Sequence, residues 1–481
     1  MSHKKLSFII SFLFLFSSLI FFFFIYVKSI NNQSYSNYYI KYYVINIFFF
    51  IFSIISFWIK KEFKFKITII LISVLISFYI IEIFLTIKDH KVRKNEIQNI
   101  TRNKIIDEKN LEKKKILYKS KTGKNFDTRS RIDVLINLEN QGENIAPVVP
   151  PGEYLDDKNL KIYPLSGVSN IKTIHCNENG YFSFYNSDRY GFNNSNHEWK
   201  KNKISYLFLG DSFTHGSCVF REDTISGNLR SQIDEKNGII NLGYSGNGPL
   251  IEYGTLKEYI DINKVERIIW IYYERNDLGD LKNRLESQIL RKYLLDKNFK
   301  QNLKFKQSQI DKIAKEKIKI SRNNIGKNLI LSDRNKENNY NKIRRYLFLT
   351  NLRIFTLEKI FNKKIPFDEF RTILEKTKNL ATENNAKFYF VYLPSSNRYI
   401  DNNNQKPNFY QKKTVLKIID DLNINSIDMV ELLFNKMQKN NIDINKVVYP
   451  FGMTDSHFNS TGYRLISEKI YQEIKKIEKN N

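Results

Sequence analysis

The sequence predicts a doubly wound, parallel-sheet α/β sandwich preceded by three transmembrane helices. Three observations support this fold class. The first 87 of the 481 residues contain three long apolar runs, and from residue 203 onwards short apolar runs alternate with amphipathic stretches. Such an alternation is typical of strands that are buried on both faces of a parallel sheet. The chain also has only two cysteines, which excludes a disulfide-dense scaffold and a four-cysteine zinc site.

The N-terminal region, residues 1–87, holds the candidate membrane spans Leu6–Val27, Tyr42–Ile59 and Ile67–Ile87. Each has roughly the 20 apolar residues that a helix needs to cross a bilayer. No small-residue cleavage site follows the first run, so we expect it to be retained rather than removed as a signal peptide. The basic loop between the second and third runs should be cytoplasmic, which puts everything after residue 87 outside. An error in the number of spans would reverse this orientation.

The third run contains Glu82, a carboxylate within a predicted membrane span. Such residues are expensive in a bilayer and are candidates for function. The alternative, which we favour, is a protonated glutamate or one that reaches the membrane interface.

The net charge of +27 is concentrated in two stretches, residues 88–131 and 278–346. No nucleic-acid-binding signature accompanies either stretch, so we expect no nucleic-acid partner. Solvated lysine faces are the main interpretation, and attraction to anionic lipid or anionic glycan is the next.

Residues 88–130 are charged with weak helical periodicity, which predicts a linker or stalk. Residues 131–202 mix proline, glycine, asparagine and aromatic residues, which predicts an irregular β/loop pre-domain. The main domain is expected over residues 203–481, interrupted by a basic helical insertion at 278–346. Its expected strands are Ile204–Leu209, Gly238–Leu242, Arg267–Tyr273, Lys387–Leu393 and Ile424–Met429. Its expected helices are Thr224–Ile233, Leu250–Ile260, Phe367–Asn384, Lys413–Leu422 and Tyr463–Ile477. Right-handed crossovers would place these helices on both faces of the sheet.

Polar residues follow several of these strands, at the edge where parallel sheets bind ligands. Ser212 follows the first strand, Gly246 the second and Asn276 the third, while Asp455 and His457 precede the last helix. Together they supply a hydroxyl, a flexible backbone, an amide and a carboxylate–imidazole pair. A serine hydroxyl is a weak nucleophile until a base removes its proton, and an imidazole can do this at neutral pH. These groups therefore predict acyl transfer.

Of the six histidines, His457 is the preferred base because Asp455 lies two residues before it. His215 follows Ser212 by three residues and could crowd the site. The oxyanion donors expected are the backbone N–H groups of Ser212 and Gly246 and the side-chain amide of Asn276, because a tetrahedral oxyanion needs preorganised donors.

Four sequence blocks resemble those of the SGNH (GDSL-type) hydrolases. Gly210-Asp211-Ser212 resembles the first block, and residues 241–247, read as N-x-G-x-S-G-N, resemble the second. Asn276-Asp277 resembles the third block, and Asp455-Ser456-His457 resembles the last. The resemblance covers residues 203–478 except for the basic insertion, and it implies an SGNH/flavodoxin-like sandwich in a bacterial membrane-anchored member.

By this resemblance Ser212 is the nucleophile, His457 the base and Asp455 its partner, and Ser212, Gly246 and Asn276 form the oxyanion hole. Three acidic residues are expected to support the site: Asp211, Glu274 and Asp277. Two departures from the family pattern stand out. Glu274 replaces a glycine of the third block, where it could narrow the pocket or add a carboxylate near the acyl site. The spacing of the last block is one residue shorter.

The function expected is a serine esterase that hydrolyses O-acyl or O-acetyl groups through an acyl-enzyme, with surface or exported glycans as substrate. One alternative is a polysaccharide O-acyltransferase with the same triad, which would need a membrane partner. The other is a non-catalytic, membrane-tethered, glycan-binding scaffold.

No cluster with metal-ligand spacing and no glycine-rich phosphate loop occurs, so we expect neither a metal nor a cofactor. The expected location is the bacterial inner membrane, as a multi-pass protein with the catalytic domain facing the periplasm or the exterior. Cys176 and Cys218 leave room for one disulfide if the compartment is oxidising, and the sequence leaves that open.

Overall fold

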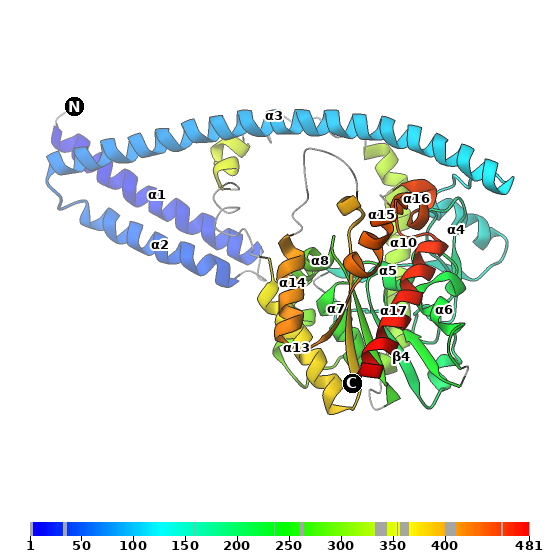
Figure 1. The fold of residues 1–481 in the computed structure, drawn as a ribbon. Coiled ribbons are helices and arrows are strands. Elements are labelled where there is room, and N and C mark those ends of the chain that lie inside the picture. Colours follow the sequence, from blue (N-terminus) through cyan, green and yellow to red (C-terminus); the bar gives the residue numbers. More distant parts are fainter. Residues whose placement is uncertain are drawn as a thin grey trace. The chain divides into compact units, whose positions relative to one another are not determined.

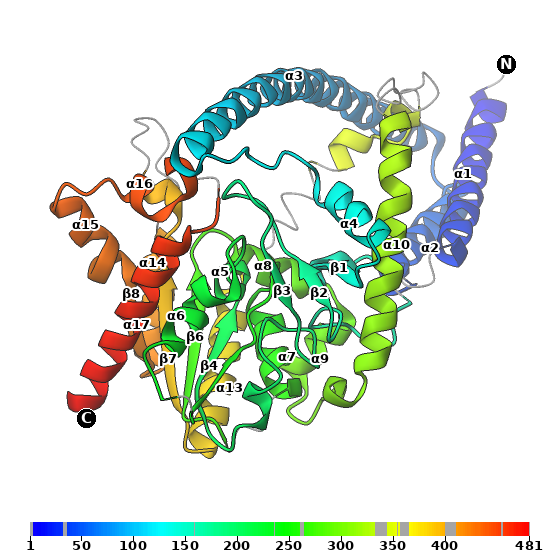
Figure 2. The same cartoon turned by 90° about the vertical axis from the view of Figure 1, so that its right-hand side faces the viewer.

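The computed structural model describes residues 3–31, 36–157, 159–234, 236–259, 264–331, 344–353, 355, 365–399, 410–453 and 456–480. The chain divides into two compact units. The first unit, here called the apolar-helix unit, contains Met1–Arg102 and Asn335–Asn362. The second, here called the sheet unit, contains Asn103–Arg334 and Lys363–Asn481. Figures 1 and 2 show the elements of both units.

The apolar-helix unit is built from α1 (His3–Asn31), α2 (Ser36–Ile55) and the first part of α3 (Lys61–Thr122). By length and composition, Lys5–Val27 and Lys61–Lys88 are long and apolar enough to cross a membrane. The apolar part of α2, Tyr42–Ile55, is shorter than a usual span because the chain turns at residues 56–58. The structure thus contains two candidate spans among its described residues rather than the three that were expected.

The charged segment after the third apolar run is helical, as its periodicity predicts. It continues α3 without a break to Thr122, so the expected linker and the third apolar run form one helix.

The pre-domain begins with α4 (Arg131–Asn140), whose start is fixed by a capping box between Ser130 and Asp133. A three-stranded sheet follows, with β1 (Ile145–Pro147) parallel to β2 (Lys172–Ile174) and β2 antiparallel to β3 (Phe184–Asn186). Two short 3-10 helices complete it, η2 (Pro151–Tyr154) and η3 (Glu198–Lys200). Val148, Tyr163 and Leu165 of this region are buried in the same core as the main sheet.

The main sheet has five parallel strands in the order β5-β4-β6-β7-β8. They are β4 (Ile204–Gly210), β5 (Gly238–Asn241), β6 (Arg267–Tyr273), β7 (Lys387–Leu393) and β8 (Asn425–Asp428). All five strands expected from the apolar runs are present. The chain goes from β4 to the edge strand β5 and then crosses back to β6. The carboxyl ends of β4 and β6 therefore form the point where the strand order reverses, which is where such sheets bind ligands.

Helices cover both faces of this sheet, because side chains alternate between the faces along each buried strand. Leu207 and Leu209 of β4 pack with α7 (Pro249–Tyr259), α13 (Phe367–Glu383) and α14 (Tyr410–Asp421). Phe208 packs on the other face, with α6 (Ile225–Arg230) and α17 (Ser460–Asn480). The remaining short elements are α5 (Ser212–His215), η4 (Arg221–Asp223), η8 (Ser396–Tyr399), the π-helix η9 (Val430–Phe434), α15 (Asn435–Lys439), α16 (Ile444–Val448) and η10 (Pro450–Gly452).

The expected basic insertion is divided between the two units. Its first part forms α8 (Asp277–Arg284), α9 (Gln288–Leu295), η6 (Leu303–Phe305) and α10 (Gln307–Leu331) in the sheet unit. Leu281, Leu290, Tyr293 and Leu303 are fully buried there, so this part packs into the core instead of lying on the surface. Its end belongs to the apolar-helix unit.

Candidate active site

Ser212 lies at the turn between β4 and α5. Asp211 precedes it as the N-cap of α5, with its carboxylate accepting a hydrogen bond from the Phe213 N–H at 2.9 Å. Gly210 ends the strand with φ +151°, and a Cβ there would lie 2.7 Å from the Ile271 carbonyl oxygen. This position therefore needs glycine. The turn leaves Ser212 partly exposed at the carboxyl edge of the sheet.

His457 lies on the loop before α17, and its imidazole is directed at Ser212. The distance between His457 Nε2 and Ser212 Oγ is 2.8 Å. The two residues are 245 positions apart in the sequence, and the structure brings their side chains into contact. In this geometry Nε2 can accept the serine proton.

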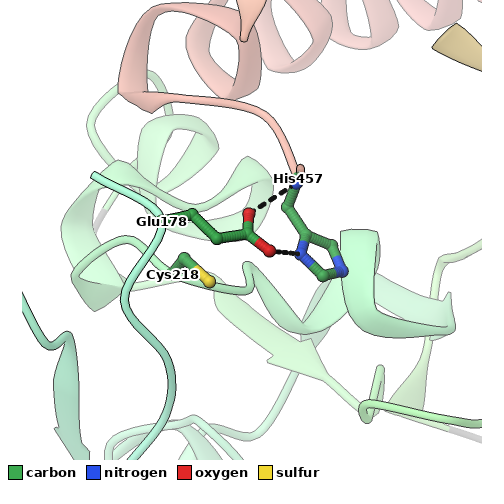
Figure 3. A group of neighbouring side chains, drawn as sticks. All are labelled: Glu178, Cys218 and His457. Carbon is green, nitrogen blue, oxygen red and sulfur yellow. Dashed lines mark hydrogen bonds and ion pairs between the residues drawn. The ribbon is translucent and has the colours of Figure 1, made fainter. Parts of the chain in front are cut away.

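The other side of the imidazole is bound by Glu178, a residue of the pre-domain. Glu178 Oε1 is 3.0 Å from His457 Nδ1, and Glu178 Oε2 accepts a hydrogen bond from the His457 backbone N–H at 2.6 Å. Figure 3 shows both contacts. A carboxylate at Nδ1 holds the proton on that nitrogen and leaves Nε2 free to act as a base. Ser212, His457 and Glu178 are therefore hydrogen-bonded in the order of a Ser-His-Glu triad.

The negative charge of Glu178 also changes the titration of the imidazole. Burial by itself would lower the pKa of His457. The hydrogen bond and charge of Glu178, with the charge of Asp211, outweigh it and raise the pKa above its ordinary value.

Glu178 was not among the residues singled out from the sequence, and Asp455, which was expected in this role, lies outside the described residues. A signal was nevertheless present, because Glu178 lies two residues after Cys176. Cys176 is bonded to Cys218, six residues after Ser212. Treating the two cysteines as a bridge would have placed Glu178 close to the nucleophile.

The disulfide between Cys176 and Cys218 joins the segment that carries the acid to the segment that carries the nucleophile. Glu178, Cys218 and His457 offer a carboxylate, a sulfur and an imidazole within 4.8 Å of one another. The sulfur of Cys218 is committed to the disulfide, and the imidazole is hydrogen-bonded to Glu178 at Nδ1. Metals bind the thiolate form of cysteine, so this group does not fit a metal ion.

Two of the expected oxyanion donors have suitable surroundings. Among the described residues, neither the Ser212 N–H nor the Gly246 N–H donates a hydrogen bond, so both remain available. Gly246 has φ +77°, a conformation that glycine adopts without cost. Its carbonyl oxygen accepts a hydrogen bond from Arg284 at 2.8 Å, which helps to fix the loop.

The third expected donor, Asn276, is used differently. Its side-chain Nδ2 donates to Asp211 Oδ2 at 3.2 Å and to Asp280 Oδ2 at 2.9 Å. Both amide hydrogens are thus taken by carboxylates, and Asn276 presents no free donor in this arrangement. It instead connects the carboxyl end of β6 to the turn that carries Ser212.

The three supporting acids are buried. Burial raises the pKa of Asp211 to about 6. Asp277 accepts a hydrogen bond from the Tyr273 N–H at 2.8 Å, and burial raises the pKa of its carboxyl as well. Glu274 binds Arg398, the Tyr392 hydroxyl and the Ser395 N–H, so it connects the ends of β6 and β7 rather than adding a free carboxylate.

His215 lies behind the site, where it supports the Gly246 loop. Its Nδ1 accepts a hydrogen bond from the Ser245 N–H at 3.2 Å, and its Nε2 is 3.1 Å from the Tyr185 hydroxyl. Burial, with the charge of His457, lowers the pKa of His215 to about 3, so this ring is neutral at physiological pH. His175 is buried beside it and hydrogen-bonds to Ser217 and Ser245 through Nε2.

A cavity of about 560 Å³ borders the triad on the side of Glu178. Its wall mixes apolar side chains, such as Phe126 and Phe182, with polar ones, such as Lys114, Arg131 and Glu178. The polar part of this wall offers both hydrogen-bond donors and acceptors.

Comparison with known proteins gives only distant likenesses. No family model and no curated protein matches the chain. Among solved structures, it is similar to the acetyl xylan esterase AlAXEase, with 14% identity over 56% of this chain and 100% of that one and a TM-score of 0.33. It is also similar to a two-domain esterase active on acetylated mannans, with 10% identity over 59% of this chain and 52% of that one and a TM-score of 0.31. A third is the acetylxylan esterase Axe2 from Geobacillus stearothermophilus, with 15% identity over 57% and 96% of the two chains and a TM-score of 0.29. Likenesses this low carry no argument about activity, which has to come from the site itself.

Proposed function

We propose that this chain is a serine esterase of the SGNH type, which hydrolyses O-acyl esters through an acyl-enzyme. One observation carries the proposal: Ser212 Oγ, His457 and Glu178 form an unbroken chain of hydrogen bonds at the carboxyl edge of a parallel sheet. A serine, an imidazole and a carboxylate in this order are the parts of nucleophilic acyl transfer.

In the first half of the reaction, Ser212 Oγ attacks the ester carbonyl carbon while His457 Nε2 takes the serine proton. The tetrahedral intermediate collapses when His457 returns that proton to the departing alcohol oxygen. In the second half, His457 removes a proton from water, the hydroxide attacks the acyl carbon, and the proton returns to Ser212 Oγ as the acid leaves. Glu178 holds the Nδ1 proton throughout and stabilises the imidazolium.

The backbone N–H groups of Ser212 and Gly246 are the donors for the tetrahedral oxyanion in this proposal. Each preorganised donor of this kind contributes roughly 3–4 kcal/mol to transition-state stabilisation. Asn276 would act indirectly, by holding Asp211 and with it the turn that carries Ser212.

The substrate class we propose is an O-acetylated glycan outside the cytoplasm. The polar side chains in the wall of the cavity beside Glu178 suit a hydroxyl-rich alcohol part. The disulfide between Cys176 and Cys218 supports an oxidising compartment. Two candidate membrane spans support anchoring in a bacterial inner membrane, and the disulfide supports placing the sheet unit on its outer side.

The proposal is tested with the full chain in detergent, by fluorophosphonate labelling and by turnover of an aryl acetate. We expect covalent labelling at Ser212 and loss of both signals in Ser212→Ala. Ser231→Ala is the matched control, because Ser231 is exposed at the end of α6 and should leave both signals unchanged. Turnover that persists in a folded Ser212→Ala chain would refute the proposal. Acyl transfer to an added glycan in place of release to water would show a transferase with the same triad.

A further inference from the structure

A short segment at the end of the basic insertion returns to the apolar-helix unit. Residues 344–353, here called the return segment, have the sequence RRYLFLTNLR, with two short helical stretches at 344–347 and 350–353. They group with α1, α2 and the first part of α3, although the preceding helix α10 belongs to the sheet unit. The segment is therefore part of a unit that contains both candidate membrane spans.

The main contact of the return segment is with Glu82, the carboxylate in the third apolar run. Glu82 is completely buried. Its Oε1 accepts a hydrogen bond from the Asn351 N–H at 3.0 Å, and its Oε2 accepts one from the Leu352 N–H at 2.7 Å. Both oxygens of Glu82, whose burial in a membrane span would otherwise be costly, thus have hydrogen-bond donors. The two N–H groups lie near the start of a helical stretch, where backbone donors need acceptors from outside the helix, and Glu82 supplies them.

Two further contacts connect the return segment to α3 and to α1. Asn351 Nδ2 donates to the Thr86 hydroxyl at 2.7 Å, one helical turn beyond Glu82. The Phe348 ring stacks on Phe24 of α1, with ring centroids 6.0 Å apart. The segment therefore contacts both helices that are long enough to cross a bilayer.

The position of Glu82 sets the depth of the return segment. Glu82 lies six residues before Lys88, where the candidate span ends, which corresponds to about 9 Å along the helix axis. Backbone at that depth has to find its hydrogen-bond partners within the protein, and Glu82 provides two of them.

The side chains of the return segment have the polarity expected near the boundary between headgroups and acyl chains. Leu347 is 63% exposed and Phe348 43% exposed, and both are apolar. Arg344 and Arg353 stand at the two ends of the segment, where long basic side chains can reach phosphate groups. Apolar side chains between basic ends are typical of peptides that lie at the boundary between headgroups and acyl chains.

We propose that the return segment is a lipid-embedded element, which lies at the headgroup–acyl boundary of the bilayer that Lys61–Lys88 crosses and is held there by Glu82. Lipid acyl chains cover Leu347 and Phe348. Because α10 leads into this segment, the sheet unit is connected to the membrane by the insertion as well as by α3. This inference rests on the crossing by Lys61–Lys88 and is independent of the proposed esterase activity.

The test uses the full chain in liposomes, with a bimane fluorophore on a cysteine introduced as Leu347→Cys. The native cysteines are joined in a disulfide and do not react. Leu295→Cys is the control, because Leu295 is 71% exposed on the sheet unit. Lipids with a nitroxide near the headgroup, placed in both leaflets, should quench the label at 347 several-fold more strongly than the label at 295. Aqueous iodide should show the opposite preference. Equal quenching of the two labels by the nitroxide lipids would overturn the proposal, and so would strong iodide quenching at 347.

A second variant tests the role of Glu82. Glu82→Leu keeps the helix apolar but removes both acceptors, so lipid quenching at 347 should fall to the level at 295. Glu82→Gln keeps one carbonyl acceptor and should give an intermediate value. Lipid quenching that is unchanged in Glu82→Leu would show that Glu82 does not hold the segment. The comparison of labels at 347 and 295 in the otherwise native chain does not depend on either variant.

Discussion

Replacement of Glu178 by glutamine is the sharpest test of the triad. Glu178 accepts hydrogen bonds from both His457 Nδ1 and the His457 backbone N–H. Glutamine has nearly the same shape, but it carries no charge and can turn an N–H group towards Nδ1. The proton of the imidazole would then move to Nε2, which could no longer accept the proton of Ser212.

The size of the effect follows from the position of this carboxyl group. In buried serine–histidine–aspartate triads, the corresponding amide substitution lowers kcat by roughly 10⁴-fold. The Glu178 side chain is 24% exposed, so water can take over part of its role. We therefore expect kcat to fall about 10²- to 10³-fold in Glu178→Gln, which corresponds to about 3–4 kcal/mol of lost transition-state stabilisation.

The assay is kcat for an aryl acetate at fixed pH, with the unfolding midpoint measured alongside. Asp455→Asn is the matched control, because it makes the same change of a carboxylate to an amide two residues from His457. We expect Asp455→Asn to keep most of the native kcat. The assignment of Glu178 would be refuted if Glu178→Gln kept its kcat while Asp455→Asn lost it. Equal losses in the two variants would contradict it too, because Glu178 is the only carboxylate hydrogen-bonded to His457 among the described residues.

Three further outcomes follow from the same geometry. His457 must be neutral to act as a base, and its pKa is raised above 6.5, so kcat/KM should fall as the pH drops through that pKa. In Glu178→Gln this acidic limb of the pH–rate profile should move to lower pH. The disulfide joins Cys176 and Cys218 across a sequence separation of 42 residues, so its reduction should lower the free energy of unfolding by about 4 kcal/mol. Reduction should also lower kcat; urea unfolding and aryl acetate turnover, each with and without reductant, measure the two effects. An unchanged kcat in the reduced, folded protein would show that the disulfide does not position Glu178. Gly246→Ala places an alanine in a left-handed backbone conformation, which costs about 1–2 kcal/mol of folding free energy, so the unfolding midpoint should fall. The substitution should also shift the Gly246 N–H that donates to the oxyanion, so kcat should fall. An unchanged kcat would show that Gly246 is not part of the oxyanion hole.

Much of the fold could be predicted from local sequence patterns. The five strands of the main sheet come from apolar runs such as Arg267–Tyr273, whose continuous hydrophobicity reflects burial on both faces. The helices α13 and α17 come from apolar periodicity. The third apolar run and the charged stretch after it differ in composition, so they were expected as separate segments. They form one helix, because hydrogen bonding within a helix continues through a change from apolar to charged residues.

The candidate site could be predicted in part. Ser212 and His457 stand at positions that the topology of a parallel sheet brings to one edge, so their meeting could be anticipated from strand order. The hydrogen bonds of the Asn276 side chain could not be anticipated, because one of them depends on how the Asp280 carboxylate of α8 is turned towards the amide. The packing of α9 and η6 into the core was also unexpected, since the lysines of these elements made the whole segment look solvent-exposed, whereas Leu290 and Leu303 are buried.

The amino-acid sequence by itself determined the apolar helices, the order of strands and helices, and the residues that carry the hydroxyl and the imidazole. Each of these depends on neighbours close in the chain, through the periodicity of buried side chains or the residues that end a strand. Only the tertiary structure decided that Glu178 binds His457 and that Glu82 binds the return segment. Both contacts join residues more than 260 positions apart, and no local pattern specifies which distant backbone or imidazole a carboxylate will reach once the chain has folded.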